Sequence, residues 1–85
     1  MAAVTIYTKP FCPYCDRALS LLERKGAQVT EIKAAFDPAL RREMLMKSGG
    51  ASTYPQIFVG GQHVGGCDDL HDLEAQGRLD ALLAG

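Results

Sequence analysis

The sequence predicts an α/β fold in which one four-stranded mixed sheet is flanked by helices in the order β-α-β-α-β-β-α. Apolar, β-branched segments alternate along the chain with segments of helical periodicity. Gly60-Gly61 lies between two short strand-like segments, which is a hairpin signal. The 85 residues contain no linker, repeat or low-complexity stretch, so residues 1–85 are expected to form a single domain.

The first half of the chain predicts a strand, a helix and a second strand. Residues 4–8 are β-branched and aromatic, so we expect a buried strand that ends before Lys9-Pro10. Residues 13–25 predict a helix, with Gly26 placed for a left-handed C-terminal cap. Its expected buried face consists of Cys15, Ala18, Leu19 and Leu22. Residues 28–33 alternate imperfectly and predict the second strand. This strand-helix-strand unit should be a right-handed parallel crossover.

The second half predicts two further helices around a hairpin. Asp37-Pro38 favours an N-cap with proline in the first turn, followed by a helix to about Ser48. Met44 is expected in the core of the fold and Met46 on the surface. Residues 56–59 and 62–64 form the predicted hairpin. A helix then begins near Cys67 and ends at Gly77, and the leucines after it predict a final helical turn.

Composition excludes several classes of function. The formal net charge is −1, so nucleic acid and anionic membranes are not expected partners. Residues 1–7 lack the basic and apolar regions of a signal peptide, and they are interpreted as the start of a strand. We therefore expect a cytoplasmic protein, in a compartment that keeps thiols reduced. Three cysteines there are not a structural disulfide framework.

Cys12-Pro13-Tyr14-Cys15, between a strand and a helix, predicts a redox site. Pro13 suits the first helical position, which places Cys12 at the N-cap, where its thiolate can accept a hydrogen bond from the N–H of Tyr14 or Cys15. Lys9 adds a nearby positive charge. Cys15 lies one turn into the helix, on its apolar face, and should be more buried and better protonated. Cys12 is therefore the predicted nucleophile and Cys15 the resolving thiol.

A zinc half-site is the alternative interpretation of the two cysteines. Structural zinc sites generally have four ligands and a second paired motif. The remaining candidates, Cys67, His63 and His71, have no standard zinc spacing, and both histidines are expected on the surface. The sequence therefore favours redox chemistry, and no metal is expected.

Three motifs together resemble a dithiol glutaredoxin of the small bacterial type. They are Lys9 to Cys15 (KPFCPYC), Thr53-Tyr54-Pro55, and Val64 to Asp69 (VGGCDD), and the resemblance covers essentially the whole chain. It implies a thioredoxin-like fold, a cis proline at Pro55 beside the cysteines, and glutathione as the cosubstrate. It also implies an enzyme that reduces protein–glutathione mixed disulfides and protein disulfides, acting as a monomer.

The resemblance also implies a set of glutathione contacts. The γ-glutamyl carboxylate should meet the N–H groups of Cys67 and Asp68, because Gly65-Gly66 leads into a helix N-terminus that favours anions. The Asp68 side chain should lie near the ligand's ammonium group. Lys9 and Arg42 should meet its glycine carboxylate. The residues expected to complete the groove are Tyr14, Thr53, Tyr54, Pro55 and Gly66.

Two departures from the family pattern bear on these contacts. Tyr54 stands where the family usually has valine, so its ring could narrow the groove or stack on a substrate. The segment of residues 48–53 looks about one residue longer than in relatives, which weakens the alignment that places Arg42 at the ligand. Cys67 is interpreted as a small residue at a helix start that could oxidise under stress.

Two other functions remain open from the sequence. One is a redoxin that is reduced by thioredoxin reductase instead of glutathione, against which the Gly65-Gly66-Cys67-Asp68 motif argues. The other is an iron–sulfur scaffold, in which Cys12 and glutathione from two subunits would hold a cluster. Pro13 stiffens the loop and argues against the scaffold.

Overall fold

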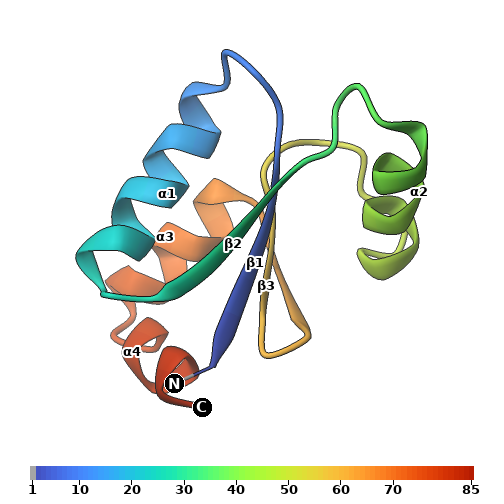
Figure 1. The fold of residues 1–85 in the computed structure, drawn as a ribbon. Helices are drawn as coiled ribbons and strands as arrows, with labels where there is room; N and C mark the ends of the chain where they lie inside the picture. Colours follow the sequence, from blue (N-terminus) through green and yellow to red (C-terminus); the bar gives the residue numbers. More distant parts are fainter. Residues whose placement is uncertain (1) are drawn as a thin grey trace.

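The computed structural model describes residues 2–85, which form four strands and four helices (Figure 1). In chain order the elements are β1 (Ala3–Thr8), α1 (Pro13–Arg24), β2 (Gln28–Lys33), α2 (Pro38–Lys47), β3 (Gln56–Val59), β4 (Gln62–Gly65), α3 (Cys67–Ala75) and α4 (Leu79–Ala84). The predicted element order is confirmed, and the predicted last helical turn is the short helix α4. The longest helix has 12 residues, and no helix within residues 2–85 is long and apolar enough to cross a membrane.

The strands form one mixed sheet in the order β2-β1-β3-β4. β1 runs parallel to β2, with Val4 opposite Val29, and antiparallel to β3, with Ile6 opposite Ile57. β3 and β4 form the predicted hairpin around Gly60-Gly61. The end of β1 therefore lies beside the start of β3, with Tyr7 opposite Gln56, and the turn that follows β1 leads to Cys12.

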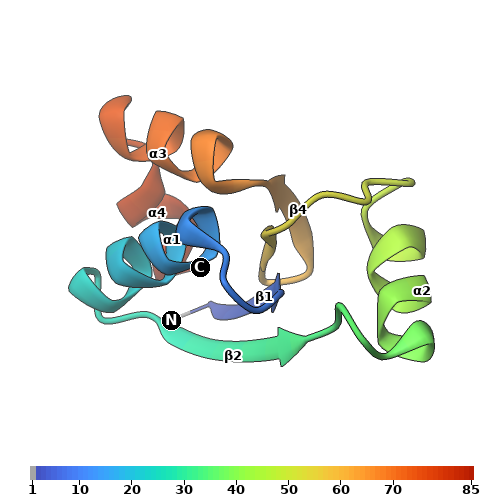
Figure 2. The same ribbon diagram turned by 90° about the horizontal axis from the view of Figure 1, so that it is seen from above.

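Helices cover both faces of the sheet. α1, α3 and α4 lie against one face and α2 lies against the other (Figures 1 and 2). The larger apolar cluster lies under α1, α3 and α4 and includes Ile6, Leu22 and Leu70. A smaller cluster beneath α2 is formed by Tyr7, Ala34, Met44 and Phe58. The side chains of β1 and β3 divide between these clusters because successive residues of a strand point to opposite faces.

The ends of the first two helices follow local sequence signals. Pro13 begins α1, and Gly26 adopts the left-handed conformation after its end, with φ +68°. Asp37 caps α2 by accepting hydrogen bonds from the N–H groups of Ala39 and Leu40, at 3.0 and 3.2 Å. These boundaries confirm the predictions to within a residue or two.

The buried face of α1 differs from its prediction at one pair of leucines. Leu19, which is predicted to face the core, is half-buried and packs against the larger cluster, whereas Leu21, which is not predicted, is fully buried. α1 packs on the sheet and also beside α3, so its buried arc is broader and rotated toward Leu21. The periodicity shows that a face is apolar but does not show how far neighbouring helices extend it.

Candidate active site

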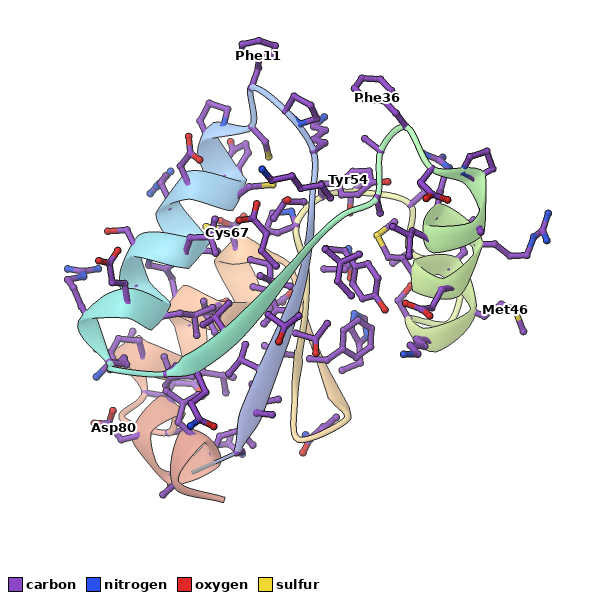
Figure 3. All side chains as sticks on the ribbon, in the orientation of Figure 1. Phe11, Phe36, Met46, Tyr54, Cys67 and Asp80 are labelled. Atoms are coloured by element: carbon purple, nitrogen blue, oxygen red, sulfur yellow. The ribbon has the colours of Figure 1, made fainter. Side chains whose placement is uncertain are left out.

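Cys12 lies at the N-cap of α1, directly after the turn that leaves β1. Its backbone is extended, with φ −115°, and its sulfur accepts a hydrogen bond from the N–H of Cys15 at 3.2 Å. Phe11, immediately before it, adopts φ +54° and points its ring into solvent (Figure 3). The predicted cap is confirmed. The first turn of α1 directs a backbone donor at the Cys12 sulfur, where negative charge is favoured.

Cys15 is held as a neutral thiol. Burial raises its pKa well above the ordinary value of 9.0, and the side-chain hydrogen bond with Cys12 raises it further, while a backbone hydrogen bond from Lys9 acts in the opposite direction. Cys15 is more buried than Cys12, as expected, but the difference is small: Cys12 is 4% and Cys15 2% exposed. The two sulfurs are distinguished by position instead: Cys12 is at the helix end and Cys15 lies within the first turn.

A groove of about 340 Å³ is lined by Tyr14, the residue between Pro13 and Cys15, and lies between the start of α1, the segment before β3, the hairpin and the start of α3. Seven predicted site residues line it: Tyr14, Thr53, Tyr54, Pro55, Gly66, Cys67 and Asp68. The Tyr54–Pro55 peptide bond is cis, as the family resemblance implies. The structure therefore brings together three motifs that are far apart in the sequence.

Four predicted site residues are not part of the groove lining: Cys12, Cys15, Lys9 and Arg42. Arg42 is exposed on α2, on the opposite face of the sheet from α1 and α3 (Figure 2). Lys9 is exposed at the end of β1, just before the cysteine motif. The structure therefore gives no geometric support to a ligand contact by Arg42, whereas Lys9 stays close to Cys12 along the chain.

The N-terminus of α3 forms one wall of the groove. Gly66 N–H donates to the Asp69 carboxylate at 2.9 Å, which satisfies the donor before the helix. Gly65 has φ +118°, and a side chain there would also collide with the Asp69 carboxylate. The next N–H groups, of Cys67 and Asp68, belong to a first helical turn and have no intrahelical acceptor. They are the N–H groups at which the sequence predicts an anion-binding site.

The Cys67 side chain is buried in the larger apolar cluster (Figure 3). Burial raises the pKa of its thiol, and the charge of Arg17 lowers it. His71 Nδ1 lies 2.9 Å from the Cys67 carbonyl oxygen and must donate to it, because a carbonyl only accepts. These contacts fit the interpretation of Cys67 as a small packed residue at a helix start. No three His, Cys, Asp or Glu side chains of residues 2–85 gather as metal ligands.

Tyr54 lies between the groove and the α2 side of the sheet. It lines the groove and also packs against the small cluster beneath α2 (Figure 3). Its hydroxyl is the one buried side-chain polar atom without a hydrogen-bond partner in the described part of the chain. A valine at this position would contribute less to the small cluster, so the tyrosine enlarges the contact between the groove wall and α2.

Several groove residues were not among the predicted site residues: Ala51, Gln56, His63, Gly65 and Asp69. Gln56 is only 3% exposed, and its amide bonds to Thr53 and His63. Gln56 could have been identified from the sequence, because it is the one polar residue of an otherwise apolar strand. A polar side chain that is buried with such a strand needs hydrogen-bond partners nearby. His63 could not be identified in the same way, because its place in the groove depends on how β3 and β4 are paired in the hairpin.

These features define a dithiol redox site in a thioredoxin-like fold, with a helix-capping cysteine and a cis proline that lines the groove together with Tyr14. The glutaredoxin family model matches residues 4–64. A glutaredoxin of Pseudomonas aeruginosa is 55% identical over 84 residues, covering 99% of each chain. The solution structure of a Brucella melitensis glutaredoxin is 59% identical, with a TM-score of 0.84 over 98% of this chain and 89% of that one.

A more distant structure adds a ligand. A buckwheat glutaredoxin, solved as a complex with glutathione, is 29% identical, with a TM-score of 0.86 over 98% of this chain and 77% of its own. The chain belongs to the glutaredoxin family and is a thiol–disulfide oxidoreductase.

Proposed function

We propose that this chain is a glutathione-dependent oxidoreductase that reduces protein–glutathione mixed disulfides and protein disulfides. The observation that carries the proposal is the hydrogen bond from Cys15 N–H to the Cys12 sulfur, within the motif whose Tyr14 lines the groove together with residues of the other two family motifs. The glutathione complex of the buckwheat relative supports the choice of ligand. The protein acts in the cytoplasm as a single monomeric domain.

Cys12 carries out the first exchange. Its thiolate attacks the glutathione sulfur of a mixed disulfide, forming a Cys12–glutathione disulfide and releasing the protein thiolate, which takes up a proton. A glutathione thiolate then attacks the glutathione sulfur on Cys12. This second exchange forms glutathione disulfide and returns the Cys12 thiolate, so one free glutathione thiol is consumed for each mixed disulfide that is reduced.

Cys15 is needed only for protein disulfides. After Cys12 attacks such a disulfide, one substrate thiol leaves and the other stays bound to Cys12. Cys15 loses its proton, attacks the Cys12 sulfur and displaces the second substrate thiol. Its raised pKa keeps Cys15 protonated until that step. Two glutathione molecules then reduce the Cys12–Cys15 disulfide.

Glutathione fits the groove through its two charged ends. The N–H groups of Cys67 and Asp68 receive the γ-glutamyl carboxylate, and the Asp68 carboxylate lies near the ammonium group. The backbone of Tyr54 pairs with the cysteinyl backbone of the ligand. Lys9 meets the glycine carboxylate, and Tyr14 and Thr53 flank the groove. Arg42 is left out of this contact set because of its position on α2.

The deciding experiment is a glutathione-coupled assay on wild type, Cys15→Ser and Cys12→Ser. Cys15→Ser is expected to retain turnover of a small glutathione mixed disulfide and to lose reduction of a protein disulfide. Cys12→Ser is expected to lose both activities. Loss of both activities in Cys15→Ser would contradict the separate roles of the two thiols.

The same protein preparation tests the two alternatives. If the protein turned over with thioredoxin reductase but not with glutathione and glutathione reductase, thioredoxin reductase and not glutathione would be its electron source. A brown dimer with charge-transfer absorbance would favour the cluster scaffold. The proposal expects a colourless protein that is active with glutathione.

A further inference from the structure

Three groove residues form a chain of hydrogen bonds that the proposed chemistry does not use. Gln56 Nε2 donates to the Thr53 carbonyl oxygen at 2.9 Å and lies 3.2 Å from the Thr53 hydroxyl oxygen. Gln56 Oε1 lies 2.7 Å from His63 Nε2. The chain therefore runs from edge strand β4, through a buried side chain of β3, to the segment that precedes the cis proline.

The donor and acceptor of each bond can be assigned from its partners. A carbonyl oxygen only accepts, so the Gln56 nitrogen must face Thr53 and the Gln56 oxygen must face His63. His63 Nε2 must then carry a proton and donate it. The neutral ring is the Nε2–H tautomer, which leaves Nδ1 without a proton.

The histidine ring is also held from one side. Its centroid lies 4.9 Å from that of Phe58, with a tilt of 33° between the rings. Phe58 in turn packs edge-on against Tyr7 within the cluster beneath α2. Although His63 is exposed as a residue, its ring position is set by packing and by one short hydrogen bond.

We infer that His63 is a positioning residue for glutathione: through Gln56 it holds the backbone of Thr53, and with it the adjacent Tyr54 backbone that receives the ligand. Without the bond to His63, the Gln56 amide can rotate, and the Thr53 carbonyl loses a fixed donor. The groove wall then has to be ordered when the ligand binds, which weakens binding without changing the chemistry at Cys12. This inference rests on the proposed function.

The kinetic test compares His63→Ala with two matched variants in a glutathione-coupled assay. His63→Ala is expected to raise KM for a small glutathione mixed disulfide about fivefold, the effect of one neutral hydrogen bond, with kcat within about twofold. His63→Gln offers an amide donor to Gln56 and should recover most of the lost affinity. Gln62→Ala, on the same strand but outside the groove, is expected to match wild type.

A fourth variant separates the two halves of the hydrogen-bond chain. Gln56→Glu keeps an oxygen for the His63 donor and removes the nitrogen that donates to Thr53. It should raise KM at least as much as His63→Ala does. Because Gln56 is buried, thermal unfolding of each variant is measured, and KM is compared below the onset of unfolding.

A spectroscopic readout tests the geometry independently of activity. In ¹⁵N NMR of the neutral imidazole, wild type should show His63 as the Nε2–H tautomer, and Gln56→Leu should relax that preference. The opposite tautomer in wild type would overturn the inference, as would an unchanged KM in His63→Ala or a failure of His63→Gln to recover affinity. Absence of turnover in wild type would instead contradict the proposed function.

Discussion

At the scale of single residues, one helical turn gives two similar thiols different environments. Both sulfurs are nearly excluded from solvent, yet Cys12 accepts a backbone hydrogen bond at the helix end, whereas the pKa of Cys15 is raised mainly by burial. A thiol that is costly to ionise is a poor nucleophile for the first step of an exchange, but it can act in a later step, after it has lost its proton. The assignment of roles therefore follows from position on α1, not from exposure.

The raised pKa values predict how stability depends on pH. Burial raises the pKa of Cys15 above 9.0 and that of Tyr7 from 10.0 to about 12, with the Glu43 hydrogen bond adding to the effect on Tyr7. Each neutral form is favoured by folding, so its contribution is complete below the unfolded pKa and is lost as pH rises through the folded pKa. The free energy of unfolding of the reduced protein should therefore fall above about pH 9, by at most about 1.4 kcal/mol per pH unit for each group.

Urea unfolding of the reduced protein at pH 7, 9 and 10.5 measures this dependence. Cys15→Ser should flatten the decline that begins near pH 9, and Tyr7→Phe the part that begins near pH 10. A decline that is equally steep in both variants would show that other groups cause it.

Some site residues could be predicted from sequence and others could not. Cys12 was predictable because proline at the first helical position fixes the cap in a local stretch of chain. His63 was not, because its contact with Gln56 depends on the register of the β3–β4 hairpin, which includes a shift between Ile57 and Phe58. Arg42 was placed by resemblance, and the position of α2 separates it from the groove.

At the scale of elements, α2 depends strongly on its cap. It is a helix of 10 residues, and Met44 is its one fully buried side chain. Asp37 satisfies two of its free N–H groups. Asp37→Ala should therefore lower the free energy of unfolding by about 1 kcal/mol, whereas Asp37→Ser, which retains a capping oxygen, should lose much less. Urea unfolding at pH 7 measures both, and equal losses would show that the cap does not account for the effect.

The elements were largely predictable because their signals are local. Asp37-Pro38 marks the start of α2, and Gly60-Gly61 marks the hairpin, without reference to the rest of the molecule. The buried arc of α1 was predicted less well, since Leu21 is buried in a cluster to which the sheet, α3 and α4 all contribute. Errors of this kind are expected wherever a helix contacts two neighbours, because periodicity records the apolar residues and not their partners.

At the scale of the whole molecule, the sheet separates two apolar clusters with different relations to the site. The larger cluster supports α1 and α3, whose N-terminal ends carry Cys12 and Cys67. The smaller cluster supports α2, and it reaches the groove through Tyr54. Chemistry at Cys12 should therefore depend mainly on one side of the sheet, while the shape of the groove depends on both.

Two methionines on α2 test this division. Met44 is 0% and Met46 77% exposed, on the same helix. Met44→Ala should lower the free energy of unfolding by about 2–5 kcal/mol through the cavity it leaves, whereas Met46→Ala should change it by less than about 0.5 kcal/mol. Hydrogen exchange should show the loss first in α2, and the rate at which Cys12 reacts with a small alkylating agent should stay within about twofold of wild type. A Met44→Ala variant in which Cys12 reactivity falls together with protection of α2 would show that the two sides of the sheet do not act separately.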